Sequence, residues 1–243
     1  MKIDSTVRIL VCTFCIAILT GCAASSIRTP AIDSPIKSVA VVSLLDEKTR
    51  VERIGLTVFN NKAETVDQTG SLNAFAIDTV EESLRQSRPG WKLKDGRAEI
   101  QSLLAAKKAG GTSWNSQVSA FQKDLAAVAK KLDVDLMFVV VDFAPENTPG
   151  RGVGVRLRTM SLSTLNDATI HAVCLLVLVD RNGNEVTNRW GSQTAIAKIP
   201  AGEIGIDYEL SNVADPEMQA KLKSLMRERL KASLEAAAKN MGY

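Results

Sequence analysis

The single histidine, His171, is the residue around which a catalytic triad, a general base or a zinc site would have to be built. Imidazole is the side chain that titrates near neutral pH and the commonest metal ligand. The chain has no HExxH and no GxSxG pattern to supply partners for it. Cys174 stands three positions further along the same strand-like run, so its side chain is expected on the opposite face. We therefore predict a structural or surface histidine, with no catalytic residue and no metal ligand.

The cysteines offer little further chemistry. Cys12 and Cys15 form the one CxxC spacing, but both fall in an amino-terminal segment that is expected to be removed, and Cys22 follows that segment. Cys174 is then left without an internal disulfide partner. It lies in the apolar run Ile170–Val179, which predicts a buried and inert thiol.

A glycine-rich segment, Gly150–Gly154, invites comparison with phosphate-binding loops. Such a loop needs a helix after the glycines, so that backbone amides and the helix dipole face the anion. A strand pattern follows here instead, which predicts a mobile start to a hairpin and no nucleotide cofactor.

The carboxylates form no recognisable catalytic pair. Asp133 and Asp135 flank a helix-to-strand turn, where such side chains accept hydrogen bonds from nearby amides. Asp142, Asp207 and Glu209 are spread along the chain, and their spacing does not place any two of them across a cleft. We predict no cofactor.

One local basic cluster stands out, formed by Arg151, Arg156 and Arg158. The last two share one face of a predicted strand. The pattern is typical of a solvated face, and the alternative is contact with phospholipid headgroups or an acidic partner. The formal charge of the whole chain is +3, a field too weak to indicate nucleic-acid binding.

The first residues carry the most specific signal. Two basic residues in Met1–Arg8 precede the apolar run Ile9–Leu19, whose roughly 11 residues are too few to span a bilayer, which takes about 20. A basic start, a short apolar run and small residues are typical of a secretory signal peptide. The next residues, Leu19-Thr20-Gly21-Cys22, resemble the lipobox of bacterial lipoproteins. The resemblance implies that residues 1–21 are removed and that Cys22 is acylated on its sulfur and on its new amino group.

The lipobox resemblance also implies a compartment. Ala23 follows Cys22, where Asp marks retention in the inner membrane of enteric-type bacteria. We therefore expect a protein anchored to the outer membrane on its periplasmic face, with the inner membrane or the cell surface as alternatives. Residues 22–36 are small, polar and proline-containing, which predicts a flexible tether. Residues 37–243 are predicted to form a single α/β domain.

The first half of that domain alternates strand and helix patterns, as parallel βαβ units do. Strands are predicted at Ser38–Leu45, Arg50–Asn60, Trp91–Leu93 and Leu136–Phe143, the first and last side by side and parallel. Helices are predicted from Ser71 to Pro89-Gly90, over Glu99–Ala109, and over Asn115–Leu132.

The second half predicts an antiparallel meander and a long closing helix, giving an α/β fold with a mixed (α+β) sheet. Strands are expected at Gly152–Thr164, Thr169–Asp180 and Glu185–Ala197. Asn182-Gly183 between the last two predicts a tight hairpin whose central residues both have positive φ. Asp215-Pro216 predicts the cap and first residue of the helix, about 26 residues long. Its predicted apolar stripe comprises Met218, Leu222, Leu225, Met226, Leu230, Leu234, Ala237 and Met241.

This order of elements over Ser38–Phe143 is similar to a periplasmic α/β theme. The amino-terminal domain of the Tol–Pal translocation protein B, the curli-secretion lipoprotein and a lipoprotein activator of penicillin-binding proteins share it. The segment Arg53–Asn61 also looks like a recurring element of uncharacterised bacterial proteins. The resemblance implies a fold used for docking to partners, and it transfers no catalytic residue.

We expect a binding, scaffold or accessory module of an envelope assembly, held at the membrane by its anchor and contacting a protein partner, and not an enzyme. The alternative is a periplasmic hydrolase or a small-ligand-binding lipoprotein that uses Asp142, Arg156 or His171. A third interpretation, favoured less, is a multimeric outer-membrane pore in which Gly152–Thr164 faces lipid.

Overall fold

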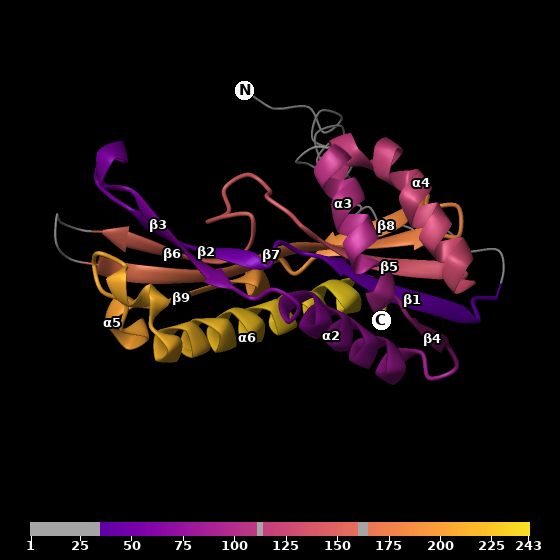
Figure 1. Ribbon diagram of the computed structural model, residues 1–243. Coiled ribbons are helices and arrows are strands. Elements are labelled where there is room, and N and C mark those ends of the chain that lie inside the picture. Colours follow the sequence, from indigo (N-terminus) through magenta and orange to yellow (C-terminus); the bar gives the residue numbers. More distant parts are fainter. Residues whose placement is uncertain (1–34, 111–113, 160–164) are drawn as a thin grey trace, which may run out of the picture. The chain divides into compact units, whose positions relative to one another are not determined.

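The frame of the molecule is a mixed β-sheet (Figure 1). The computed structural model describes residues 35–110, 114–159 and 165–243, so the predicted signal segment and Cys22 lie outside the described residues, as does nearly all of the predicted tether. Within them the sheet has nine strands. These are β1 (Ser38–Leu44), β2 (Lys48–Ile54), β3 (Lys62–Asp67), β4 (Lys92–Asp95), β5 (Leu136–Asp142), β6 (Gly152–Thr159), β7 (Leu165–Asp180), β8 (Glu185–Trp190) and β9 (Ile196–Pro200).

The long strand β7 joins two halves of the sheet. Its first half pairs antiparallel with β6 and β9, and its second half pairs antiparallel with β5 and β8. Beyond β5 lies β1, which is parallel to both β5 and β4. Beyond β6 lies β2, parallel to β6 and antiparallel to the edge strand β3. The predicted parallel pairing of Ser38–Leu45 with Leu136–Phe143 is confirmed.

Helices cover both faces of the half of the sheet that contains β1 and β5. The helices are α2 (Leu72–Ser87), α3 (Ile100–Gly110), α4 (Trp114–Leu132), α5 (Ala201–Ile204) and α6 (Pro216–Asn240), and short 3-10 turns occur at Val58–Asn60 (η1), Arg97–Glu99 (η2), Ser192–Ala195 (η3) and Ser211–Ala214 (η4). Helices α2 and α6 pack against one face, and α3 and α4 against the other (Figure 1). The predicted α/β class, with its mixed sheet and long closing helix, is confirmed.

The closing helix α6 begins as its sequence predicts. The side chain of Asp215 accepts a hydrogen bond from the backbone N–H of Glu217, and Pro216 occupies the first turn. Most of the predicted stripe is buried, whereas Met218 and Leu225 are only partly so. Each buried large aliphatic side chain contributes roughly 1.5–3 kcal/mol, so this stripe accounts for the long contact of α6 with the sheet.

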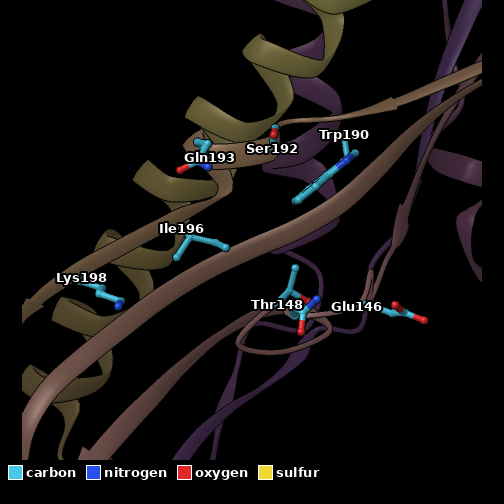
Figure 2. A pocket seen from close by; sticks show the side chains of 8 residues that line it. Glu146, Thr148, Trp190, Ser192, Gln193, Ile196 and Lys198 are labelled. Carbon is cyan, nitrogen blue, oxygen red and sulfur yellow. The ribbon is translucent and has the colours of Figure 1, made fainter.

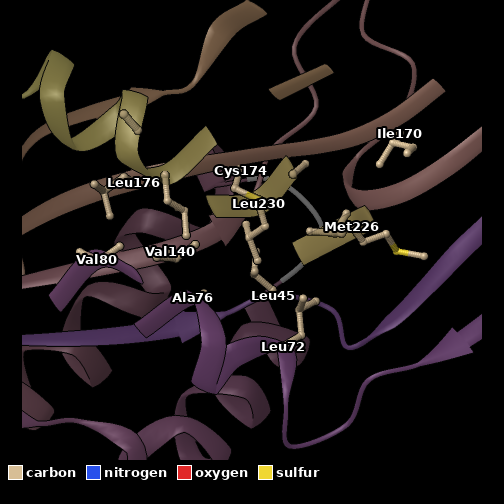
Figure 3. Close-up of a cluster of buried hydrophobic side chains, with 14 of the residues drawn as sticks. Leu45, Leu72, Ala76, Val80, Val140, Ile170, Cys174, Leu176, Met226 and Leu230 are labelled. Atoms are coloured by element: carbon tan, nitrogen blue, oxygen red, sulfur yellow. The ribbon is translucent and has the colours of Figure 1, made fainter. Parts of the chain in front are cut away.

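The core between the sheet and these helices contains Cys174, which is 1% exposed, as predicted (Figure 3). It lies among side chains from β5, β7 and α6 that include Val140, Leu176 and Leu230 (Figure 3). Burial raises the pKa of the thiol well above its ordinary value, and the nearby carboxylate of Asp142 raises it further. The thiol is therefore inert at neutral pH.

The prediction of one strand over Arg50–Asn60 is wrong. Strand β2 ends at Ile54, and the chain turns through η1 into β3, a strand that the sequence did not reveal. Gly55 is the cause, because a Cβ there would lie 2.3 Å from the Cβ of Asn60. The alternating pattern of this segment therefore belongs to a hairpin and its turn.

The strand predicted over Glu185–Ala197 is also divided. Gly191 packs so closely on α6 that a Cβ would lie 2.6 Å from the Cα of Ser233, and η3 separates β8 from β9 there. The predicted hairpin before β8 is present, but its turn differs. Gly183 has positive φ (77°) and Asn182 does not, because the carboxylate of Asp180 accepts the N–H of Asn182 at 2.8 Å and sets a longer turn.

The remaining boundaries agree to within a few residues, except that β7 begins at Leu165, before the predicted Thr169. Residues 160–164, the end of the strand predicted over Gly152–Thr164, lie outside the described residues. In the described part of the chain, no helix combines the length and the apolar character needed to cross a membrane. The domain limits 37–243 stay a prediction.

Candidate docking surface

Helices α3 and α4 cover one part of a face of the sheet, and no helix among the described residues lies over the rest of that face (Figure 1). We call the outward side chains of β2, β6, β9 and the first half of β7 the open face. Strand register arranges them in three rows across the sheet. The rows are Arg50–Gly154–His171–Ile196, Glu52–Arg156–Thr169–Lys198 and Ile54–Arg158–Asp167–Pro200.

The structure places Arg156 and Arg158 on the open face, as their spacing predicts. Arg156 is half-buried and lies 3.6 Å from Glu52, which also pairs with Arg50 at 3.1 Å. Arg158 is exposed and forms no ion pair within 4 Å to any carboxylate in the described residues. Arg151 is exposed and lies in the loop just before β6, outside the strand that carries Arg156 and Arg158.

The side chains on the other face of β6 are buried in the core. Val153, Val155 and Leu157 are buried in the cluster that includes α6. The apolar side chains of the described strand therefore belong to the core, and the pore interpretation stays a prediction.

The glycines of the predicted mobile segment have a defined packing role. The loop before β6 lies on the imidazole of His171, and a Cβ at Gly150 would be 2.4 Å from its Nε2. A Cβ at Gly154 would be 2.8 Å from the carbonyl oxygen of Arg50 and 3.0 Å from the same ring. Gly152 has φ of 63° and lies against the carboxylate of Asp142. Positions 150, 152 and 154 are glycine because the backbone crosses the buried groups of His171 and Asp142 there.

His171 is accordingly a buried residue, 6% exposed, on the face opposite to Cys174 as predicted. Burial lowers its pKa from 6.5 to about 4, and the positive charge of Arg156 acts in the same direction. The imidazole is therefore neutral at physiological pH and is covered by Gly150. A catalytic base needs access to its substrate and a pKa closer to the working pH.

A second polar group is buried where β1 and β5 end. Asp142 is 8% exposed, and its carboxylate contacts the ammonium of Lys107 on α3 at 2.8 Å and the backbone N–H of Asp46 at 3.1 Å. The ammonium of Lys107 also donates to the carbonyl of Leu44. Sequence reasoning noticed Asp142 but missed Lys107, because 35 residues separate the two. This pair connects α3 to the sheet and is largely shielded from solvent.

The other acidic residues serve local structure. Asp135 accepts the backbone N–H groups of Lys37 and Ser38 at 2.8 and 2.9 Å, and these hydrogen bonds lower its pKa. Asp133 pairs with Arg181 at 2.7 Å. In the described residues, no three His, Cys, Asp or Glu side chains are grouped so as to hold a metal ion.

A pocket of about 440 Å³ lies between the loop before β6 and the β8–β9 connection (Figure 2). Trp190 lines it together with polar side chains from both segments, namely Glu146, Asn147, Thr148, Ser192, Gln193 and Lys198. The ring of Phe143 packs edge-on against Trp190 at 6.0 Å. Two residues of the lining, Asn147 and Ser192, have positive φ (65° and 53°). Sequence reasoning did not identify this pocket.

The turn of the β2–β3 hairpin carries the second feature that the sequence did not reveal. We call residues 55–61 the apolar tip. Phe59 is 92% exposed and Leu56 is 62% exposed, and they are the large apolar side chains exposed among the described residues. Gly55 and Asn60-Asn61 are turn-forming residues and do indicate a turn here. The alternation of side-chain type that continues from the preceding strand favours an unbroken strand instead.

No model of a known protein family matches this chain, and no curated protein sequence matches it. Among solved structures, the crystal structure of lipoprotein GNA1162 from Neisseria meningitidis matches with 16% identity over 77% of this chain and 93% of that chain. The TM-score is 0.29, too loose a superposition to support an inference about this chain. The likeness to translocation protein B and the curli-secretion lipoprotein stays a resemblance of element order.

Proposed function

We propose that this protein is a lipid-anchored binding module of the bacterial envelope, tethered through Cys22 and docking a protein partner with its open face. The observation that carries the proposal is that no helix among the described residues lies over β2, β6 and β9 on that face. Its charged side chains there, Arg50, Glu52, Arg156, Arg158 and Lys198, stand beside the apolar Ile54, Ile196 and Pro200. A sheet face normally buries apolar side chains against another layer. The charged side chains of the open face suit contact with a polar surface instead.

The charge of the open face favours an acidic partner. The face has two carboxylates: Glu52 is paired with Arg50 and Arg156, and Asp167 lies across from Arg158 in the sheet register. Four basic side chains, Arg50, Arg156, Arg158 and Lys198, therefore outnumber the two acidic ones. Arg158 and Lys198 are exposed in neighbouring rows and have no ion pair within 4 Å among the described residues. Exposed charges of one sign speed the encounter with a partner of the opposite sign and select against like-charged ones.

Proximity labelling from the full-length lipoprotein in its native envelope, read by mass spectrometry, tests the proposal. The variant is Arg158→Glu with Lys198→Glu, since both side chains are exposed. Arg156 is spared because its reversal would break the pair with Glu52. The matched control is Lys92→Glu with Lys94→Glu, two exposed lysines on the edge strand β4. We expect partner recovery to fall about tenfold in the open-face variant and to stay unchanged in the control.

Equal recovery from both charge-reversed proteins, with thermal unfolding unchanged, would rule out the open face as the docking surface. His171→Ala provides the complementary arm. A docking module should keep its cellular role in this variant as long as the protein folds, whereas a general-base mechanism should lose it.

A second candidate, binding of a small polar ligand, is favoured by the pocket beside Trp190 (Figure 2). A half-exposed indole ring beside amide and hydroxyl groups suits a ligand with an apolar face and a hydroxylated rim. Titration of the protein with soluble envelope glycan fragments, followed by tryptophan fluorescence, tests it. Trp190→Phe should remove the response and Trp91→Phe should keep it.

A further inference from the structure

The apolar tip is built to hold its side chains away from the protein. The backbone N–H of Gly55 donates to Oδ1 of Asn61 at 2.9 Å, and that of Asn60 donates to the carbonyl of Thr57 at 3.0 Å. At the base, Nε and Nη2 of the buried Arg53 donate to the Asn60 carbonyl at 3.2 and 3.0 Å. The turn is fixed from both strands, so its exposed side chains project from a defined support.

Arg53 also connects the β2–β3 hairpin to the rest of the fold. Its Nη1 donates to the carbonyl of Tyr208 at 2.5 Å, and its guanidinium lies 4.1 Å from the centre of the Tyr208 ring. Glu209 lies 3.5 Å from Arg53 and 3.9 Å from Lys62, so the nearby carboxylate is balanced by two cations.

The tip itself is uncharged, and basic residues lie next to it. Residues 55–61 contain no charged side chain, and two of their apolar side chains, Leu56 and Phe59, stand in solvent. The nearest basic side chains outside the turn are Lys62 at the start of β3, half-buried and paired with the exposed carboxylate of Glu209, and the exposed Arg158 on β6 beside Ile54. An apolar, uncharged end with a cationic margin is the pattern of segments that enter the interface of an anionic membrane.

We propose that the apolar tip is a second membrane contact, in which Phe59 and Leu56 enter the interfacial layer of a phospholipid bilayer and Lys62 and Arg158 lie at the headgroups. The inference rests on the proposed function in one respect, the anchor at Cys22 that brings the domain to the membrane. A tether of about 14 residues reaches at most roughly 50 Å, so the domain stays at the bilayer surface.

The size of the tip favours lipid over a protein or a second copy of this chain. A stable protein interface buries about 800 Å² on each partner, which two side chains on a narrow turn do not provide. A bilayer requires no complementary surface, and its affinity for a segment grows with the apolar area inserted. The amides and hydroxyl of Asn60, Asn61 and Thr57 would meet the hydrated headgroup layer.

The test uses the full-length lipoprotein in vesicles of phosphatidylcholine and phosphatidylglycerol. Thr57→Cys places a nitroxide label in the tip, and Ala98→Cys places one at an exposed control position in η2. Cys174 is buried and does not compete for the label. We expect access of an aqueous nickel chelate to position 57 to be about tenfold lower than to position 98. Adding Leu56→Ser and Phe59→Ser to the Thr57→Cys protein should restore that access.

Equal access at positions 57 and 98, or protection that survives the two serine substitutions, would overturn the proposal. Protection that rises with the protein-to-lipid ratio would assign the tip to a second copy. Protection found in native membranes but absent from vesicles would assign it to a protein partner. The vesicles contain no partner, so a failure here is distinct from a failure of open-face docking. Mass spectrometry of the purified protein reports the acylation of Cys22 separately.

Discussion

At the scale of single residues, His171 shows how burial changes the chemistry that a residue type can perform. Its pKa is lowered to about 4, first by burial and second by the charge of Arg156. The unfolded chain, with an imidazole pKa near 6.5, therefore takes up a proton first as the pH falls. The stability contributed by the neutral imidazole is fully present above pH 6.5 and is lost as the pH falls from there to 4.

This linkage gives the first prediction. A pKa difference of this size corresponds to about 3 kcal/mol, so the free energy of unfolding should fall by roughly 2–3 kcal/mol between pH 7 and pH 4.5. Urea unfolding at several pH values measures it. His171→Gln removes the only histidine and should flatten the profile across this range. An equally steep profile in the glutamine variant would assign the acid sensitivity to the carboxylates.

The second prediction concerns the glycines that pack on this ring. Gly154→Ala should lower the free energy of unfolding by about 1–3 kcal/mol, because its Cβ meets a backbone oxygen at 2.8 Å. Gly150→Ala should act through His171, so its cost should shrink when His171→Ala is added. Gly90→Ala is the control, since its Cβ would meet nothing within 4 Å. Equal melting temperatures for the Gly154 and Gly90 variants would contradict this packing account.

At the scale of elements, β5 contributes to the apolar core on each of the two faces of the sheet. Every residue from Leu136 to Asp142 is buried, and Val140 lies between Ser43 of β1 and Leu176 of β7. Val140→Asp would place an unpaired carboxylate there and should cost at least about 3 kcal/mol. Thr65→Asp on the exposed edge strand β3 should cost less than about 1 kcal/mol. Urea unfolding of both variants checks this, and similar losses would argue against a buried β5.

The elements that could be predicted from the sequence are those marked by a local pattern of apolar residues. Helix α6 is predictable because Asp215 caps it and apolar residues recur over its 25 residues. Strands β1 and β5 are predictable because unbroken apolar runs suit a strand that is covered on both faces. The shared face of Arg156 and Arg158 follows from the two-residue period of a strand.

The features that the sequence did not reveal depend on contacts between distant residues. Nothing near Gly150 indicates that its backbone will lie on the ring of His171. The division of the strand predicted over Glu185–Ala197 depends on Ser233, in a helix more than 40 positions away. The open face is invisible for the same reason, since whether a helix covers a strand is decided by the tertiary arrangement. Local patterns report propensity, and tertiary contacts override it.

At the scale of the whole molecule, the two proposed contacts would have different roles. The apolar tip would orient the domain at the membrane, and the open face would bind the partner. Complete burial of Leu56 and Phe59 would contribute about 3–6 kcal/mol, which is too weak to hold the protein at a membrane but sufficient to orient one that is already attached. The proposed lipid anchor, with two or three chains, would supply the attachment. The open face then needs only modest affinity, because a tether that confines module and partner to the same surface raises their effective concentration.

The last prediction tests the attachment. Cys22→Ser removes the thiol that lipidation requires, so the protein should stay as unprocessed precursor in the inner membrane, without acylation. Fractionation, intact mass and the amino-terminal sequence of the product measure this. A change at Cys174, such as Cys174→Ala, is the control, because that buried thiol has no part in anchoring. Recovery of open-face partners should fall by about a hundredfold or more in the serine variant. The uncleaved segment would hold it at the inner membrane, so the millimolar effective concentration that a shared membrane surface contributes would be lost. A serine variant that is cleaved normally and still fractionates with the outer membrane would show that Cys22 is not the anchor. Attachment would then have to come from the folded domain, with the apolar tip as the first segment to examine.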